Sequence, residues 1–263
     1  SVVCRRNSKG RALVGIVQLN ELVVNSKYGY WTLIHEVIHI LAFSPSQVFQ
    51  FDLLKVSKSK YWKNYLVVES ELLLKYAFDH FGCATTDILI EKESESVSLV
   101  HLSYMMFESE LMTPFPVQFP SFSEFTFNVI EATMFFNVNR RFNIPLVWQY
   151  KAGFNLFKIL KSKNQNSFYD VYSGLCNIQG EYGCSSNFLS KGICDSHSYT
   201  HGMFVYIGLQ NDSCYDIDSD DPKYCLRTFN NVMSSDCFRV KISDDSKSLL
   251  INKEDQWVKC TNE

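Results

Sequence analysis

The stretch YWTLIHEVIHILAF, from Tyr30 to Phe43, decides the fold of this chain. Its apolar residues recur at intervals of three and four positions, which predicts a buried helix that Pro45 ends. His35 and His39 are four positions apart, so a helix places both imidazoles on one face, with Glu36 one position round. This HEVIH pattern predicts that the two histidines bind zinc and that Glu36 activates a water. Two half-buried core histidines are the competing interpretation.

Zinc needs a third protein ligand, and the sequence offers two kinds. The pattern HExxHxxGxxH would require glycine at position 42 and histidine at position 45, where this chain has Ala42 and Pro45. A glutamate on a following helix is one alternative, and Glu69 and Glu71 are the candidates. A more distant histidine is the other alternative. If residue 42 needs a positive φ, alanine there costs roughly 1 kcal/mol, so we expect a strained turn.

His101 is the favoured third ligand among the remaining histidines. It lies eleven residues before Met112, which belongs to the segment ELMTP, and a methionine shortly after the third histidine is typical of metzincin peptidases. His80 stands at the end of a predicted helix, where a surface role as a C-terminal cap is typical. His197 and His201 are four positions apart in a loop-like context and are interpreted as a solvated pair.

Composition and charge exclude several classes of protein. The 263 residues carry a net charge of -3 with a pI near 6.1, and the lysines are scattered, so we expect no nucleic-acid partner. No apolar window is long enough to span a bilayer, so any membrane anchor is expected outside this chain. Because Ser1 does not begin a signal peptide, an exported protein is expected to have a further N-terminal part.

Cysteine usage indicates an extracellular or cell-surface protein of the secretory pathway. Most of the nine cysteines crowd into the last third of the chain, which predicts a disulfide-stapled C-terminal region. Asn211 begins a glycosylation sequon just before one of them. The odd number implies a free thiol or an external partner. The disulfide candidates are Cys4, Cys83, Cys176, Cys184, Cys194, Cys214, Cys225, Cys237 and Cys260.

The remaining patterns predict an α+β fold with a catalytic region at 1–145 and a Cys-rich, mainly strand-and-loop subdomain at 146–263. Arg11–Asn20 is rich in β-branched residues and predicts a strand. Tyr65–His80 predicts a helix that ends before Gly82 as a C-terminal cap. Ser121 to Glu124 has the spacing of a capping box and predicts the start of a helix over about 121–134.

The order of these motifs resembles leishmanolysin, the M8 family of metzincin zinc peptidases. The resemblance covers nearly the whole chain, and its later blocks are more specific than HExxH. The matching segments are Cys4 followed by GRALVG at 10–15, HEVIHILAFS at 35–44, HFGC at 80–83, His101, ELMT at 110–113, PLVWQYKAG at 145–153 and GCSSNFLSKGICD at 183–195, then Cys214 and Cys225.

This resemblance implies a zinc endopeptidase that acts on proteins or peptides. It implies an insertion over about 44–100, His101 as the third zinc ligand and Met112 as the methionine beneath the metal. It also implies that the strand around Leu13 to Leu19 pairs with an extended substrate backbone. The alternative function is a degenerate module of the same family that has a structural or protein-interaction role.

Overall fold

The computed structural model describes residues 1–26, 29–44, 56–58, 65–68, 70–84, 88–91, 101–114, 119–151, 176, 178–185, 187–195, 205–214, 223–230, 232–244 and 248–259. The chain forms two compact units, Ser1–Phe168 and Tyr169–Glu263. Helices and sheets share the first unit, and the described part of the second is built from strands and loops, which confirms the α+β class. The division falls later than the expected residue 145, and Trp148, which lies between the two positions, is buried with its carbonyl 2.9 Å from His80 Nε2.

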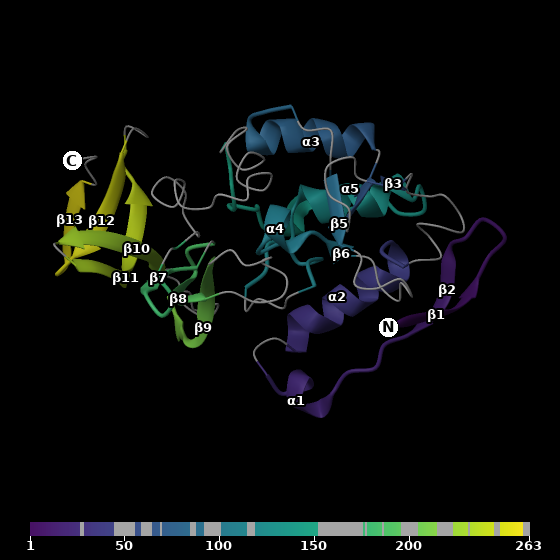
Figure 1. Cartoon of the computed structure of the whole chain (residues 1–263), viewed down its shortest axis with the longest axis horizontal. Coiled ribbons are helices and arrows are strands. Elements are labelled where there is room, and N and C mark those ends of the chain that lie inside the picture. The colour runs from purple at the N-terminus through teal and green to yellow at the C-terminus, as the bar shows by residue number, and fades with distance from the viewer. Residues whose placement is uncertain are drawn as a thin grey trace. The chain divides into compact units, whose positions relative to one another are not determined.

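The first unit contains two antiparallel sheets and several helices (Figure 1). Its elements are β1 (Val2–Arg6), β2 (Ala12–Ile16), α1 (Glu21–Val24), α2 (Gly29–Leu41), β3 (Val56–Lys58), β4 (Tyr65–Val68), α3 (Glu71–Phe81), β5 (Ile88–Glu91), β6 (His101–Leu102), α4 (Tyr104–Phe107), α5 (Glu124–Ala132) and the 3-10 helix η2 (Arg140–Phe142).

The β1–β2 hairpin packs against the predicted helix α2. Val2 pairs with Ile16 and Arg6 with Ala12, so β2 is shorter than the predicted strand 11–20. A Cβ atom on Gly15 would lie 2.6 Å from the Ile40 side chain, so only glycine lets this strand approach the helix so closely.

The segment between the second and third histidines is built into the first unit as the meander β3–β4–β5–β6 and the helix α3. The helix predicted over Tyr65–His80 is wrong in its first part, because Tyr65–Val68 pairs with Ile88–Glu91 as a strand. The helix begins only after Ser70, whose hydroxyl accepts a hydrogen bond from Leu73 N. Gly82 ends it with φ 71°, as predicted from its position.

Helices α3 and α5 pack together through aromatic side chains. The Phe125 ring of α5 lies 4.7 Å from Tyr76 and 5.6 Å from His80, measured between centroids. His80 is 3% exposed and its Nε2 lies 2.9 Å from the Trp148 carbonyl, so the predicted surface role of His80 is wrong. Helix α5 is capped by Ser123, whose Oγ accepts from Phe125 N, and not by the predicted Ser121. Ser121 is occupied in a backbone bridge with Glu110.

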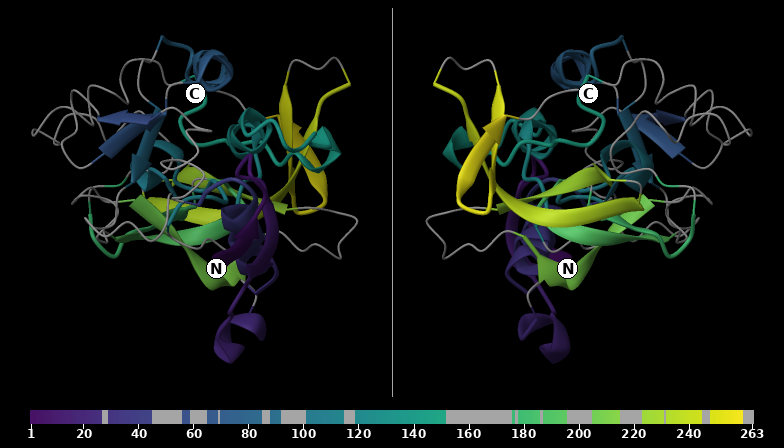
Figure 2. Two further views of the ribbon diagram at one scale, coloured as in Figure 1. Left: turned by 90° about the vertical axis from the view of Figure 1, so that its right-hand side faces the viewer. Right: turned by 90° about the vertical axis from the view of Figure 1, so that its left-hand side faces the viewer.

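The described part of the second unit consists of two antiparallel sheets. The larger one is visibly twisted in side view (Figure 2). The strands of the smaller sheet are β7 (Tyr182–Cys184), β8 (Ser190–Asp195) and β9 (Val205–Ser213), and those of the larger are β10 (Lys223–Asn230), β11 (Val232–Ile242), β12 (Leu249–Lys253) and β13 (Gln256–Lys259). Asn211, the predicted glycosylation site, lies within β9.

Three disulfides join described cysteines of the second unit, as the cysteine distribution predicts. They join Cys176 to Cys194, Cys184 to Cys225 and Cys214 to Cys237. Cys4 and Cys83 are free thiols, so their inclusion among the disulfide candidates is wrong. Cys4 is exposed on β1, whereas Cys83 is buried after α3. Cys260 lies outside the described residues.

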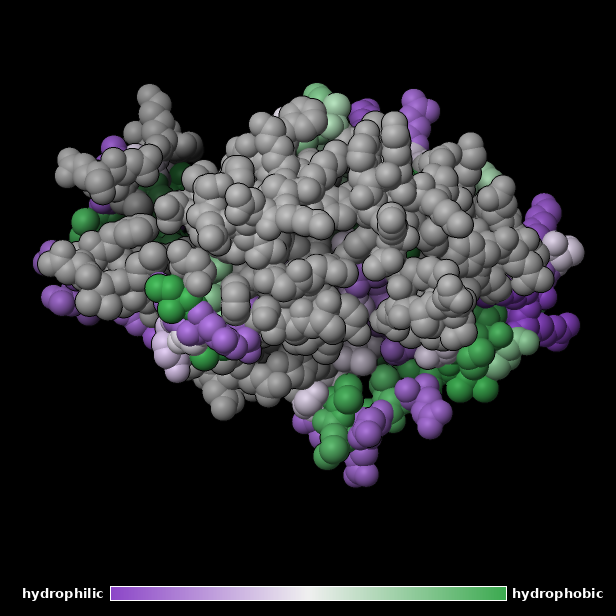
Figure 3. Space-filling model, viewed as in Figure 1, coloured by the Kyte–Doolittle hydropathy of each residue, from purple (hydrophilic) through white to green (hydrophobic). Residues whose placement is uncertain are grey.

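The first unit exposes apolar side chains on its N-terminal elements. Leu13, Val14 and Ile16 of β2 are more than half exposed, and so are Leu22 and Val24 of α1. The space-filling view shows this hydrophobic surface along the lower edge, over α1 and the β1–β2 hairpin (Figure 3). Among the residues that the structure describes, no helix is both long and apolar enough to cross a membrane.

Candidate metal centre

Helix α2 brings His35 and His39 together. Their spacing of four positions places them one above the other on the helix surface, and their Nε2 atoms lie 2.9 Å apart. His39 is 1% exposed, and His35 is partly covered. The geometry predicted from the HEVIH pattern is therefore present.

Strand β6 supplies the third imidazole. Pairing of Glu91 with His101 and of Ile90 with Leu102 fixes the register of β6 on β5. The His101 Nε2 atom lies 3.1 Å from that of His39 and 3.3 Å from that of His35. Within the described ranges these three histidines form the group that could hold a metal ion.

Backbone carbonyls fix the protonation of two of these rings. His35 Nδ1 donates to the Leu111 carbonyl at 2.7 Å, and His39 Nδ1 donates to the Phe43 carbonyl at 3.2 Å. A neutral imidazole has one N–H, so each of these rings presents a lone pair at Nε2. Burial lowers the pKa of His35, and burial together with the neighbouring His35 lowers the pKa of His39 to about 4. Both rings are thus neutral near pH 7.

The donor set fits a zinc ion. Two unprotonated nitrogens 2.9 Å apart repel each other unless a cation lies between them. Nitrogens bound to a tetrahedral zinc at about 2.0 to 2.1 Å are separated by roughly 3.3 Å. The observed separations of 2.9 to 3.3 Å are close to this value, and burial likewise keeps the pKa of His101 well below its ordinary value. Three neutral imidazoles can therefore coordinate one ion and leave a fourth position for water.

The turn predicted around Met112 lies beside the histidines. Thr113 N donates to the Glu110 carbonyl at 3.1 Å, which closes the four-residue turn, and Leu102 N donates to the Met112 carbonyl at 2.9 Å. Met112 is fully buried. The turn is thus joined to β6, which carries His101, and to His35 through Leu111. The position of the Met112 side chain beneath the metal stays a prediction.

Glu36 is half-buried on α2, next to His35. Burial acts to raise the pKa of Glu36, but a hydrogen bond from the Ser1 amino group, 2.8 Å from Oε2, lowers it below the ordinary value. Glu36 is therefore ionised at neutral pH and can accept a proton.

Ala42 does not strain the chain after the helix. Its φ is not positive, and its N–H donates to the Ile38 carbonyl at 2.9 Å, as in a continuing helix. Phe43 N donates to the same carbonyl, and this wide turn places the Phe43 carbonyl against His39. The expected cost of alanine is therefore wrong, because the backbone at Ala42 is accessible to any residue.

The other sequence candidates lie elsewhere. Glu71 is an exposed residue at the start of α3 and does not belong to the histidine cluster. Glu69, His197 and His201 lie outside the described residues. The sequence does not reveal the Leu111 carbonyl as a partner of His35, because every residue has a backbone carbonyl. It could have indicated the buried Glu110, since a charged residue within an apolar segment is unusual.

Comparison with known families matches residues 1–261 to leishmanolysin, peptidase family M8. The chain belongs to the leishmanolysin family. The resemblance predicted from the motifs is thereby confirmed over nearly the full length. The three-histidine cluster agrees with the metallopeptidase character of this family, in which zinc is the metal.

A metallopeptidase of the ciliated left-right organizer from Danio rerio is similar to this leishmanolysin-family chain. The two are 22% identical over 303 aligned residues, which cover 98% of this chain and 47% of the Danio rerio protein. The chain therefore spans about half the length of this relative.

Proposed function

We propose that this chain is the catalytic part of a zinc-dependent endopeptidase that hydrolyses peptide bonds of proteins. The observation that supports it is the convergence of the His35, His39 and His101 Nε2 atoms, with the first two rings oriented by backbone carbonyls. Membership in the leishmanolysin family supports it independently. The three disulfides are typical of an oxidising compartment, so we place the protein at the cell surface or outside the cell.

In this proposal the three imidazoles hold zinc, and Glu36 is the general base. Zinc, when bound, supplies Lewis acidity that lowers the pKa of a water and polarises the scissile carbonyl. The Glu36 carboxylate takes a proton from the attacking water at one carboxylate oxygen and then donates it to the departing amine. A carboxylate that is ionised at neutral pH can accept this proton.

The exposed strand β2 is proposed to receive the substrate. Its Leu13, Val14 and Ile16 side chains are exposed, and β1 pairs with one of its two edges. The other edge has no strand partner among the described elements, so its backbone groups are available to an extended peptide. Apolar substrate side chains would contact Leu13 and Val14.

Glu36→Gln tests this function, with Glu71→Gln as the matched control. We expect wild type to contain about one zinc per chain and to cleave an unfolded protein in a manner abolished by a zinc chelator. Glu36→Gln should retain zinc and lose about 10²- to 10⁴-fold in kcat. Glu71→Gln, an exposed helix residue, should retain both.

The outcome separates the two functions predicted from the sequence. A wild-type chain that binds zinc but cleaves no unfolded protein supports the degenerate interaction module. A wild-type chain without metal defeats both zinc-dependent interpretations.

A further inference from the structure

Glu110 is a fully buried carboxyl that sequence reasoning assigned no role. Its Oε1 accepts hydrogen bonds from Ser123 N at 3.2 Å and from Thr126 Oγ1 at 2.5 Å. Both donors belong to the first turn of α5 or its cap. Its Oε2 is also buried and has no hydrogen-bond partner among the described residues. A buried carboxyl with one unbonded oxygen destabilises a fold, so its presence points to a role other than stability.

Glu110 begins the turn whose next residue orients a metal ligand. The Leu111 carbonyl accepts the Nδ1–H of His35 at 2.7 Å. The Glu110 carbonyl accepts both the backbone N–H of Thr113 at 3.1 Å and its hydroxyl at 2.8 Å, which makes the turn tight. The Glu110 carboxyl ties this tight turn to α5.

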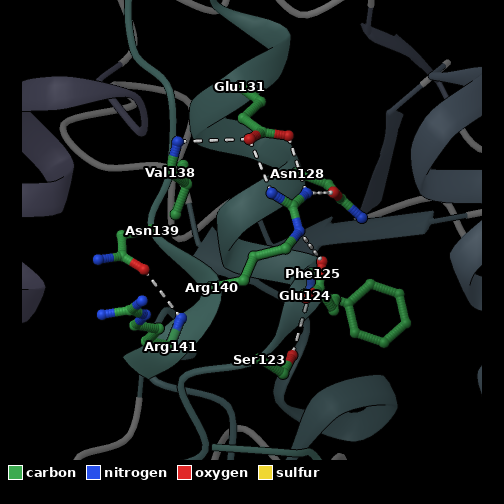
Figure 4. Close-up of polar contacts among 9 residues, drawn as sticks. All are labelled: Ser123, Glu124, Phe125, Asn128, Glu131, Val138, Asn139, Arg140 and Arg141. Atoms are coloured by element: carbon green, nitrogen blue, oxygen red, sulfur yellow. Dashed lines mark hydrogen bonds and ion pairs between the residues drawn. The ribbon is translucent and has the colours of Figure 1, made fainter. Parts of the chain in front are cut away.

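The position of helix α5 is itself fixed by contacts on two sides. Arg140 lies against one side of it and donates to Glu131, Glu124 and Asn128 (Figure 4). The side chain of Phe125 is fully buried against α3. Because α5 is held on both sides, a bond from Glu110 to its first turn restricts where the Leu111 carbonyl can lie.

We propose that Glu110 is a positioning residue for the metal centre: its carboxyl fixes the turn that holds the Leu111 carbonyl against the His35 imidazole. The inference rests on the proposed function for its consequence, zinc affinity. Glu110 itself touches no metal ligand through its side-chain hydrogen bonds. Partners that orient ligating histidines typically contribute 10- to 100-fold to metal affinity.

Two threonines of the same helix region provide a matched pair of variants. Thr126 and Thr133 are both fully buried, and their hydroxyls donate at 2.5 and 2.6 Å. Thr126 bonds to Glu110, whereas Thr133 bonds to the Ile130 carbonyl of α5 itself. Thr126→Val and Thr133→Val should therefore lower the thermal stability similarly. Only Thr126→Val should weaken zinc binding, by about tenfold in a competition titration with a chromogenic chelator.

Substitutions at Glu110 itself provide the second test. Glu110→Gln can still accept from Ser123 N and Thr126 Oγ1 through its amide oxygen, so zinc affinity should stay within about threefold of wild type. Glu110→Ala removes the tie and should weaken zinc at least as much as Thr126→Val does. If Glu110→Ala fails to fold, the two threonine variants still decide the question. Equal zinc affinity of Thr126→Val, Thr133→Val and wild type would overturn the proposal.

A metal-free measurement separates this inference from the proposed function. In the metal-free chain, nitrogen NMR of labelled histidine should show His35 protonated at Nδ1 in wild type and in Thr133→Val. Thr126→Val should increase the population of the Nε2–H tautomer of that ring. A wild type that binds no zinc would sink the proposed function, while an unchanged His35 tautomer in Thr126→Val would sink the positioning role.

Discussion

The Nε2 atoms of His39 and His101 lie 3.1 Å apart, although the two residues are separated by 62 positions in the chain. Strand β6 is short, and its position depends on the pairing of Glu91 with His101. The segment between the second and third histidines thus contributes the sheet that delivers the last ligand. The metal centre and the meander β3–β6 form one structural unit.

Replacing His101 should therefore remove zinc from the protein, whereas replacing the buried His80 should not. His101→Ala deletes a ligand, so zinc affinity should fall by more than about 100-fold, beyond the loss typical of outer-shell partners. His80→Gln is the control, because His80 is equally buried but bonds to the Trp148 carbonyl, and it should retain zinc. Elemental analysis of both purified variants checks this. Zinc retained at one per chain in His101→Ala would contradict the proposed ligand set.

Glycine at position 42 should destabilise the protein. Ala42 is fully buried and its backbone needs no positive φ, so Ala42→Gly loses a buried methyl group and adds freedom to the unfolded chain. The free energy of unfolding should fall by about 1 to 2 kcal/mol. Denaturant titration of both proteins measures it. A gain in stability would mean that alanine is strained after all.

Glu110 should make stability depend on pH. Burial raises the pKa of Glu110 to about 7, whereas the same carboxyl in the unfolded chain has a pKa near 4.3. The folded protein therefore keeps a proton that the unfolded chain loses, and this contribution to stability is lost as pH rises from about 4.3 to about 7. Tyr76 of α3 is a titratable neighbour of Glu110. Burial, together with the charge of Glu110, raises the pKa of Tyr76.

The measurement compares wild type with Glu110→Gln between pH 5 and pH 8. The difference in their unfolding free energies should change by on the order of 3 kcal/mol, since a tenfold change in proton affinity corresponds to about 1.4 kcal/mol. Relative to Glu110→Gln, wild type should be more stable at pH 5 than at pH 8. A difference that does not change with pH would show that Glu110 is ionised throughout.

The Arg140 cluster should contribute modestly to stability. Arg140 is 39% exposed, so water screens its pairing with Glu124 and Glu131. Arg140→Ala should cost about 1 kcal/mol, and added salt should reduce this difference. The adjacent Arg141, whose backbone N–H is capped by Asn139, is the control, and Arg141→Ala should change stability by less than about 0.5 kcal/mol. Equal losses in the two variants would mean that the cluster adds nothing specific.

Disulfide loss should scale with the length of the loop that the bond closes. Cys184 and Cys225 are 41 positions apart, and Cys176 and Cys194 are 18 apart. Chain entropy predicts losses of about 4 and about 3 kcal/mol for the corresponding double alanine variants. Denaturant unfolding of each variant checks the order. A larger loss from the shorter loop would indicate that contacts in the folded second unit dominate.

The sequence by itself determined whatever depends on neighbours along the chain. The spacing of His35 and His39 sets their shared helical face, because an α-helix repeats every 3.6 residues. Gly82 marks a helix end, since glycine adopts the left-handed conformation without strain. The concentration of cysteines after residue 175 likewise predicts a cross-linked region, which the three disulfides confirm.

Only the tertiary structure decided the features that depend on distant contacts. Tyr65–Val68 has an apolar pattern that suits a helix or a strand, and pairing with β5 chose the strand. The position of His80 at a helix end predicts an exposed cap, but packing against Phe125 and the Trp148 carbonyl buries the side chain. The Leu111 carbonyl became a partner of His35 only because β6 and the following turn fold against α2. Local geometry follows from covalent neighbours, whereas such contacts depend on how the elements exclude water together.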